Sequence, residues 1–453
     1  MTGRNPNTFV YKPIAIDLFC GAGGMSEGLL QAGFDIAFSS DISEQAGVTY
    51  VHRHEQLGIR QGVDTFFCRD DIKNLSGSFI LEKIKSLPKY AELKDVHIAA
   101  VFGGPPCQGF SRNGERKGPD DPRNFLFREY VRVIREIMPD YVVMENVEGF
   151  TDTKLQGFVG LTGIQYFDED SLAPRLLESE LALAGYHVIP SKILDASDYG
   201  VPQARHRAIF LAYRDGLTPP VYPKPTYGPE KKVTVMEAIG DLIGEKCPCS
   251  LSEYAKASIA GRTPSAKTGK PIRSSHYKNT ELSRLTEIVQ ERFSLYSQGQ
   301  TTSELRKMIA KRGIDLTSVP HLVAYCSENL GITEQEVISL AREGSVDRAF
   351  LDTLLTKKNV RTRLRANKPS PTVVTIADDY VHPTENRTFS VRELARLQSF
   401  DDSFEFLGKR TTGGPRRRVE VPQYTQVGNA VPPLLAKAIA LEILKAELQN
   451  KNG

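Results

Sequence analysis

The stretch Ile14-Ala-Ile-Asp-Leu-Phe-Cys-Gly-Ala-Gly-Gly24 joins an apolar run to a glycine-rich turn. The run Ile14–Phe19 predicts a buried strand, and Ser26–Ala32 predicts the helix that follows it. Glycines in the turn allow positive φ and let a ligand approach the backbone closely. In an open α/β sheet such turns lie beyond the carboxyl ends of the strands, where ligands bind. The stretch therefore predicts both the fold class and the place of a ligand site.

Short apolar runs alternate with longer amphipathic segments downstream of this stretch. The amphipathic spacing of Phe127–Ile137 predicts a helix. Further strands are expected at Ile36–Ser39, Ile98–Phe102, Tyr141–Met144, Tyr186–Ile193 and Ala208–Tyr213. Such alternation predicts an α/β protein with a mostly parallel sheet and helices on both faces.

Composition excludes several other classes of protein. With 40% hydrophobic and 25% charged residues in 453, the chain is neither wholly disordered nor collagen-like. The six cysteines are sparse and scattered, which fits a reducing compartment. Cys247 and Cys249 form one close pair with no second pair, so no zinc site is expected. The first 13 residues lack the apolar core of a signal peptide, and no apolar run approaches the roughly 20 residues of a membrane span.

The charge is distributed unevenly along the chain. The 58 basic and 55 acidic residues leave a net charge of only +3. Residues 221–370, however, hold 24 basic and 16 acidic residues, while the remainder holds 34 and 39. The basic block therefore suits a polyanion as partner, and the rest of the chain does not.

Prolines and polar residues mark where the organisation changes. Four prolines crowd together after Thr218, as at a domain boundary, and polar, basic sequence follows with helical stretches around 280–296, 302–312 and 334–355. Helices are expected again at Val391–Gln398 and Leu434–Leu448. We therefore expect a large domain in residues 1–217, a smaller one in 218–385, and a segment, 386–453, that completes the first.

Acidic residues follow two further strands of the predicted sheet. Asp41 lies where a carboxylate can accept hydrogen bonds from both ribose hydroxyls, and Asp71, after Phe66–Cys68, could meet an adenine amino group. The glycine spacing differs from G-x-G-x-x-G, so a dinucleotide is not favoured. An adenosine ligand without a phosphate cradle is favoured, and S-adenosylmethionine fits.

The segment Val101-Phe-Gly-Gly-Pro-Pro-Cys-Gln-Gly-Phe-Ser111 places a cysteine just past a buried strand. Two prolines stiffen the loop, and reactive thiols lie on such exposed loops near positive charge. Cys107 is therefore a candidate nucleophile. Cys20, within the glycine turn, is expected to pack as a small apolar residue.

An ordered set of motifs covering about two thirds of the chain resembles the DNA (cytosine-5)-methyltransferases of bacterial type. The matching segments are DLFCGAGG at 17–24, Asp41, Asp71-Ile72, GGPPCQGFS at 103–111, MENVEGF at 144–150, YGVPQARHR at 199–207, Arg387–Phe400, and QVGNAVPP at 426–433. The resemblance implies a Rossmann-like S-adenosylmethionine-dependent methyltransferase fold with a smaller target-recognition domain at 218–385.

The resemblance also implies catalytic roles. The Cys107 thiolate would add to C6 of cytosine, which turns C5 into an enamine carbon that can attack a sulfonium methyl group. Glu145 would hydrogen-bond N3 and N4 of the base, and Asn146 would orient the cysteine loop. Arg205 and Arg207 alternate, so a strand would point both to one face. Arg207 is expected to reach cytosine O2, and Arg205 to support it.

Cofactor and DNA contacts follow from the same resemblance. Asp41 replaces a glutamate frequent in the family, and Ile42 stands where an aromatic residue is common. Residues expected to bind S-adenosylmethionine, which leaves as S-adenosylhomocysteine, are Phe19, Gly21, Ala22, Gly23, Gly24, Asp41, Ile42, Asp71, Ile72, Pro106, Leu126, Asn429 and Ala430. The mobile loop Gln108–Lys117 would contact DNA through Gln108, Ser111, Arg112 and Asn113. No metal is required.

The basic block would read double-stranded DNA through some of its cations. Three clusters stand out: Lys267, Lys270, Arg273 and Lys278; Arg306, Lys307, Lys311 and Arg312; and Lys357, Lys358, Arg361, Arg363 and Arg365. We expect a cytoplasmic bacterial enzyme, monomeric on DNA, with companion restriction or phage-defence proteins and no membrane partner. Two alternatives stay open: a transfer-RNA cytosine-5 methyltransferase, and a non-catalytic DNA-binding regulator with the same fold.

Overall fold

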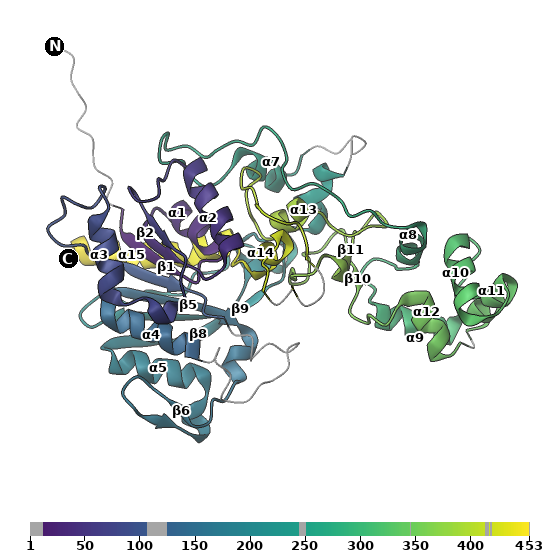
Figure 1. Cartoon of the computed structure of the whole chain (residues 1–453), viewed down its shortest axis with the longest axis horizontal. Coiled ribbons are helices and arrows are strands. Elements are labelled where there is room, and N and C mark those ends of the chain that lie inside the picture. The colour runs from purple at the N-terminus through teal and green to yellow at the C-terminus, as the bar shows by residue number, and fades with distance from the viewer. Residues whose placement is uncertain are drawn as a thin grey trace, which may run out of the picture.

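The computed structural model describes residues 12–106, 125–243, 251–344, 346–412, 416 and 419–452. A seven-stranded sheet in the order β3-β2-β1-β4-β5-β9-β8 forms the core of the larger lobe, at the left of Figure 1. The strands are β1 Ile14–Leu18, β2 Asp35–Ser40, β3 Phe66–Cys68, β4 Ala100–Gly103, β5 Tyr141–Val147, β8 Tyr186–Asp195 and β9 His206–Arg214. β1 to β5 pair in parallel, and β9 is antiparallel to both neighbours. The predicted mostly parallel α/β sheet is confirmed.

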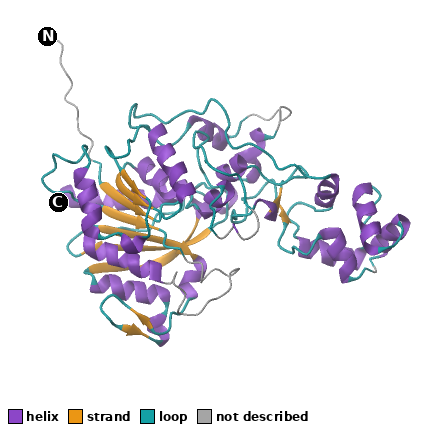
Figure 2. Cartoon of the chain, viewed as in Figure 1, coloured by secondary structure: helices purple, strands orange, loops and turns teal. Residues whose placement is uncertain are grey.

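Helices pack against both faces of the sheet (Figure 2). Successive strand residues point to opposite faces, so Ile16 of β1 joins one core and Ala15 joins the other. Helices α3 Gly77–Ser86, α4 Phe125–Ile137 and α5 Ala173–Leu183 supply the first core, and α1 Gly24–Ala32 and α15 Pro433–Asn452 supply the second. Both faces are covered, as a parallel sheet requires.

The last helix packs directly on the first. Gly28 of α1 lies so close to α15 that a Cβ atom there would stand 2.6 Å from Lys437 N and 2.7 Å from Pro433 O. Leu435, Ile439 and Ile443 of α15 fill the core beneath. The C-terminal segment therefore completes the domain that the N-terminal segment begins.

The run Gln423–Lys451 is also long and apolar enough to pass a length-and-hydropathy test for a membrane span. Its most apolar 18-residue window is 56% buried within the protein, because α15 packs against the sheet. Core helices of soluble proteins commonly pass this test, so the run does not by itself indicate a membrane.

The remaining elements lie outside the main sheet. Helix α2 spans Glu44–Gln56, and two small sheets pair β6 Phe158–Val159 with β7 Gln165–Tyr166 and β10 Thr362–Arg363 with β11 Tyr380–Val381. The other α-helices are α6 Val235–Ile239, α7 Glu253–Ala260, α8 Glu287–Ser294, α9 Thr302–Arg312, α10 Pro320–Leu330, α11 Glu334–Glu343, α12 Arg348–Leu355, α13 Val391–Leu397 and α14 Gln423–Asn429.

Helices α8 to α12 form a group that we call the helical unit (residues 286–356). Leu305, Leu322, Val337 and Leu354 lie in its own core, separate from those of the sheet. The stretch 334–355, expected to be helical throughout, is two helices because α11 ends at Gly344 (φ 75°), a left-handed cap. Helix α10, which the sequence analysis did not predict, lies between them and α9 along the chain.

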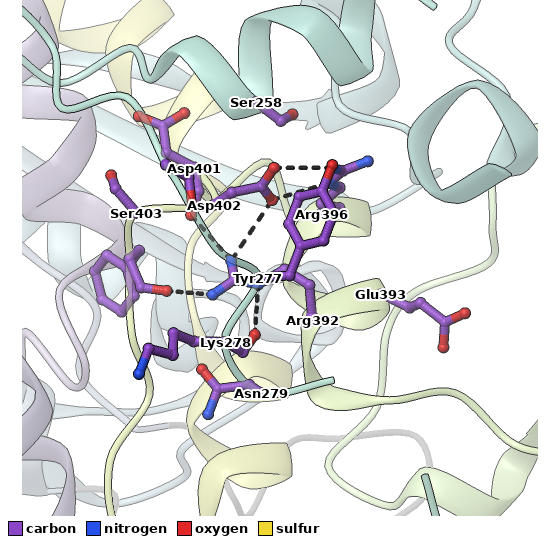
Figure 3. Close-up of polar contacts among 12 residues, drawn as sticks. Ser258, Tyr277, Lys278, Asn279, Arg392, Glu393, Arg396, Asp401, Asp402 and Ser403 are labelled. Carbon is purple, nitrogen blue, oxygen red and sulfur yellow. Dashed lines mark hydrogen bonds and ion pairs between the residues drawn. The ribbon is translucent and has the colours of Figure 1, made fainter. Parts of the chain in front are cut away.

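Residues 218–385 divide between two cores. Val235, Ile239 and Tyr254 share a core with Phe389 and Leu394 of the C-terminal segment, whereas the helical unit has its own. Buried arginines connect part of residues 218–385 to the C-terminal segment (Figure 3). Arg396 pairs with Asp402 (2.8 Å) and with Asp241 (2.9 Å), and Arg392 donates to the Lys278 carbonyl (3.0 Å). The domain limits at 217/218 and 385/386 stay predictions.

The α1–α15 contact generates a stability prediction. Gly28→Ala should lower the free energy of unfolding by about 1–3 kcal/mol, because the new methyl group overlaps the α15 backbone. Gly228→Ala is the matched control, since its Cβ enters open space at ordinary φ. Urea unfolding followed by circular dichroism measures both variants. Equal stability of the two would contradict this packing.

Candidate active site

The glycine turn that follows β1 lies at the carboxyl edge of the sheet. Phe19 (φ 58°), Gly21 (φ 55°) and Gly23 (φ 101°) all adopt the left-handed region, so the chain doubles back tightly before α1. No atom lies within 4 Å of the position that a Gly21 Cβ would occupy. The turn therefore leaves the backbone at Gly21 open on one side.

The Asp41 carboxylate spans the ends of the first two strands. It accepts hydrogen bonds from the Gly21 N–H (2.8 Å) and from the Ser43 N–H (2.8 Å). Burial raises the pKa of Asp41, and these two backbone hydrogen bonds oppose the rise. Each oxygen keeps a lone pair for a further donor, such as a hydroxyl group. Ile42 beside it is 68% exposed and presents an apolar surface at the same edge.

The next strand end contributes less. One Asp71 oxygen accepts from the Lys73 N–H (3.1 Å) and caps the short 3₁₀-helix Ile72–Asn74, which leaves the other oxygen at a half-buried position. Ile72 is 4% exposed and belongs to the core under the sheet. Leu126, at the start of α4, is half-buried against that core.

The C-terminal segment borders the glycine turn from the other side. A Cβ atom on Gly24 would lie 3.1 Å from Ala430 Cβ, so the two backbones are in close contact. Ala22 is buried in the core that also holds Ala430. Asn429 ends α14 with an exposed side chain. The predicted partners at 21–24 and 429–430 are therefore adjacent in space.

A buried polar chain supports the glycine turn from below. The Ser26 hydroxyl donates to Asp17 (2.5 Å) and lies 3.0 Å from the Tyr50 hydroxyl, which contacts Ser39. Burial is the main cause that raises the pKa of Asp17 to about 7. Cys20 is 6% exposed, and burial raises the pKa of its thiol, so the prediction that it packs is confirmed.

Glu145 and Arg207 form an ion pair across neighbouring strands. Arg207 Nε lies 2.7 Å from Glu145 Oε1, and both side chains are about nine-tenths buried. Glu145 lies inside β5, one strand position beyond the predicted end at Met144. Burial lowers the pKa of Arg207, and the Glu145 charge opposes that change. The pair places an acceptor and a donor of opposite charge side by side.

The loop that leads to the predicted nucleophile begins directly above this pair. The Asn146 side chain donates to the Pro105 carbonyl (3.2 Å), as expected of a residue that orients the loop. A Cβ atom on Gly104 would stand 3.1 Å from Glu145 Oε2, so the loop passes close over the carboxylate. Pro106 is exposed. Cys107, Gln108, Ser111, Arg112 and Asn113 lie outside the described residues.

Arg205 holds two distant segments rather than facing the open site. Its guanidinium donates to the carbonyls of Val373 (3.2 Å) and Gly428 (3.0 Å), and it is 2% exposed. Burial, with the nearby Arg207 charge, lowers its pKa well below the ordinary value. Arg205 therefore joins the start of β9 to Val373 and to the C-terminal motif through backbone contacts.

Two glutamines that sequence reasoning gave no role join three parts of the site. Gln203 donates to Gln398 Oε1 (2.8 Å) and accepts from the Val373 N–H (2.7 Å), and Gln398 donates to the Val427 carbonyl (2.7 Å). Both side chains are fully buried. Both glutamines lie inside motifs that the sequence analysis had identified, YGVPQARHR and Arg387–Phe400, and this position could have indicated a role. Because buried amides need hydrogen-bond partners, that role is to bind other segments of the chain.

A group of potential metal ligands lies elsewhere. His97, Asp140 and Glu447 gather at the amino edge of the sheet, before β4 and β5 begin. His97 Nε2 lies 2.8 Å from Asp140, while Arg214 and Lys451 supply further positive charge within 3.6 Å. This group is an ion-pair network remote from the glycine turn.

Comparison with known proteins assigns the whole arrangement to one group. The sequence profile described as C-5 cytosine-specific DNA methylase matches residues 14–445. The chain is 31% identical to the Type II methyltransferase M.XorII of Xanthomonas oryzae pv. oryzae, over 96% of this chain and 85% of that protein. It is 31% identical to the Type II methyltransferase M.DdeI of Desulfomicrobium norvegicum, over 94% and 88%.

A solved structure shares the fold. A prophage-encoded E. coli protein described as a DNA modification methyltransferase superposes with a TM-score of 0.62 at 21% identity, covering 96% of this chain and all of that one. The fold expected from the motifs is thus confirmed.

The perturbed carboxyl group beneath the turn makes stability depend on pH. The unfolded Asp17 carboxyl ionises near pH 3.8, whereas the folded one retains its proton until about pH 7. Its contribution to stability is thus fully present below pH 3.8 and is lost as pH rises through 7. Asp17→Asn should therefore gain stability relative to wild type between pH 4 and pH 8, by up to about 4 kcal/mol.

Urea unfolding of both proteins at several pH values measures that difference, in which the other titrating groups cancel. A difference that stays constant from pH 4 to pH 8 would show that Asp17 titrates normally.

Proposed function

Because this chain belongs to the C-5 cytosine-specific DNA methylase family, we propose that its carboxyl-edge site methylates a cytosine that has left the DNA duplex. The activity is that of a DNA (cytosine-5)-methyltransferase. The observation that carries the residue-level proposal is the Glu145–Arg207 pair at the base of the cysteine loop.

The donor set at the glycine turn fits S-adenosylmethionine. The open backbone at Gly21 accommodates a close ligand, and the Asp41 carboxylate keeps lone pairs for ribose hydroxyls. Ile42 offers an apolar face to adenine, and Asn429 borders the opposite end. We assign the other expected cofactor positions to the same site: Phe19, Ala22, Gly23, Gly24, Asp71, Ile72, Pro106, Leu126 and Ala430. When bound, this group supplies an electrophilic methyl attached to a sulfonium.

Cys107 begins the reaction on the base. Its thiolate bonds to C6, which makes C5 a nucleophilic carbon. After C5 has gained the methyl group, a base removes the C5 proton, the electrons restore the C5–C6 double bond, and the Cys107–C6 bond breaks. Because addition places negative charge on the ring, a donor at N3 must accompany it.

Glu145 and Arg207 supply the hydrogen bonds to the polar atoms of the cytosine ring. Glu145, which is paired with Arg207, can accept a hydrogen bond from the cytosine amino group. Entry of the base lets Arg207 move its guanidinium to O2, and Glu145 can then hold a proton toward N3. Arg205 and Asn146 keep these groups and the loop in register.

A cytosine within a duplex cannot reach this site. The enzyme must extrude it, which costs a few kcal/mol of unpairing and unstacking. We assign DNA contact beside the vacated position to Gln108, Ser111, Arg112 and Asn113 of the cysteine loop.

The biological setting follows from the relatives. They are named Type II methyltransferases, so we place this chain as the modification enzyme of a restriction–modification system in a bacterial cytoplasm. We propose that it acts as a monomer on double-stranded DNA without a metal, alongside a companion restriction or defence protein.

Activity is tested by transfer of tritiated methyl from S-adenosylmethionine to mixed-sequence duplex DNA and to transfer RNA. We expect DNA to be labelled and Cys107→Ala to abolish labelling, because no thiolate remains to activate C5. Label on RNA alone would favour the transfer-RNA alternative, and no label at all would favour a non-catalytic regulator. Bisulfite sequencing of the product then gives the recognition sequence.

Cofactor binding is tested separately by calorimetry. Asp41→Ala should weaken S-adenosylmethionine binding roughly 10- to 100-fold, the usual cost of hydrogen bonds to a charged group. Asp64→Ala is the matched control, because that carboxylate precedes β3 at the opposite edge of the sheet. Unchanged affinity of Asp41→Ala would refute the ribose assignment.

A further inference from the structure

The surplus of basic over acidic residues in 221–370 comes from outside the helical unit. The helical unit (residues 286–356) holds 7 basic and 10 acidic residues, a net charge of −3. Residues 357–370, which we call the basic segment, hold 6 basic residues and no acidic one. Since phosphate contacts require local positive charge, the two neighbours suit different partners.

Several basic side chains of the helical unit already have partners within the protein. Arg306 pairs with Asp352 (2.6 Å), Arg342 lies 3.4 Å from Asp315, and buried Arg292 donates to the Leu354 carbonyl. Among the exposed basic residues of the helical unit that the structure describes, only Lys307, Lys311 and Arg312, on the outer side of α9, have no ion pair. The helical unit thus offers one small basic patch on an acidic body.

The first basic cluster is also badly placed for the site. Ala266 donates to the Leu57 carbonyl, and Lys267 packs on Gly58, just past the end of α2. Helix α2 starts near the carboxyl edge and runs 13 residues away from it, about 20 Å. Lys267 therefore lies toward the opposite edge of the sheet.

The basic segment, in contrast, runs from the helical unit into the active site. Figure 1 shows β10 and β11 between the helical unit and the sheet. Ser370, at the end of the segment, donates its N–H to the Pro202 carbonyl and accepts from the Ala204 N–H, next to Arg205. The segment is thus hydrogen-bonded to the residues that directly precede β9, the strand of Arg207.

Within the basic segment the cations divide by role. Arg361 and Arg363 are buried, with Arg363 donating to the carbonyls of Phe293 and His382, and Lys358 pairs with Asp378. Lys357, Arg365 and Lys368 are exposed and have no ion pair among the described residues. These three side chains are the ones available to an outside polyanion.

We propose that the DNA backbone is bound by Lys357, Arg365 and Lys368 of the basic segment, and that the helical unit makes no phosphate contact. This inference rests on the proposed function, since it concerns the DNA that the site would methylate. The basic segment fixes the register of the duplex over the site, because phosphate contacts position DNA without reading its sequence.

The test compares two triple variants of the full-length protein. One is Lys357→Ala/Arg365→Ala/Lys368→Ala, and the matched control is Lys307→Ala/Lys311→Ala/Arg312→Ala, which removes the same charge from α9. Binding of a fluorescein-labelled 30-base-pair duplex of mixed sequence is measured by anisotropy across a salt series. Mixed sequence suffices because phosphate contacts carry non-specific binding.

The slope of log K against log[salt] is negative for a protein that binds phosphates. We expect the basic-segment variant to reduce the magnitude of this slope by about 2–3, at about 0.9 for each phosphate that is no longer neutralised. The α9 variant should retain the wild-type slope and bind within about twofold. An equal effect in both variants, an effect only in the α9 variant, or no effect in either overturns the proposal.

Arg365 packs over Gly299, so its removal could disturb folding. The double variant Lys357→Ala/Lys368→Ala, compared with Lys307→Ala/Lys311→Ala, keeps that packing and should lower the slope by about 2. Methyl transfer by the wild-type protein is measured in parallel. Failure of that transfer counts against the proposed function, whereas a wrong salt slope in an active enzyme counts against the basic segment alone.

Discussion

The buried hydrogen bond between Gln203 and Gln398 joins two segments that are 195 residues apart in sequence. Gln203 follows β8 and precedes the arginine strand β9, and Gln398 ends α13. Together the two amides bind backbone groups of Val373, Leu397 and Val427. Neither side chain reaches water, so each donor and acceptor must find a protein partner or cost the full desolvation penalty. A fully satisfied network of this kind admits one arrangement of the three segments, and that arrangement forms the site.

Several properties of the site depend on this junction. It holds residue 373 where Arg205 can bind its carbonyl, and it holds the end of α14 beside the glycine turn. The segment 386–452 thus faces the glycine turn through Ala430 and packs on α1 through α15. A site assembled from both ends of a chain needs such buried contacts, because the residues between those ends do not by themselves hold the two ends together. The buried arginines of α13 fasten residues 241 and 278 onto the same framework.

The centre of the sheet was predictable because β1, β4, β5 and β9 are largely buried on both faces and a glycine-rich turn follows β1. β1, β2, β4, β8 and β9 lie within two residues of their expected limits, and β5 ends three residues later than expected. The helical unit was less predictable. Helix α10 begins at Pro320 after a non-helical Val319, and the break between α11 and α12 depends on a single glycine cap. Charge counting over a long block also hid the contrast between an acidic helical unit and the basic segment that follows it.

The order of motifs by itself determined the family and the fold class, because both depend on local sequence: a glycine turn after a strand, a cysteine after two prolines, an acid at a strand end. Only the tertiary structure decided which groups pair. It placed Glu145 against Arg207, turned Arg205 toward the carbonyls of Val373 and Gly428, and buried Arg361 and Arg363 while leaving Lys357 and Lys368 exposed. The physical reason is that a charge's role depends on its desolvation and its nearest partners, and both are set by residues distant in the chain.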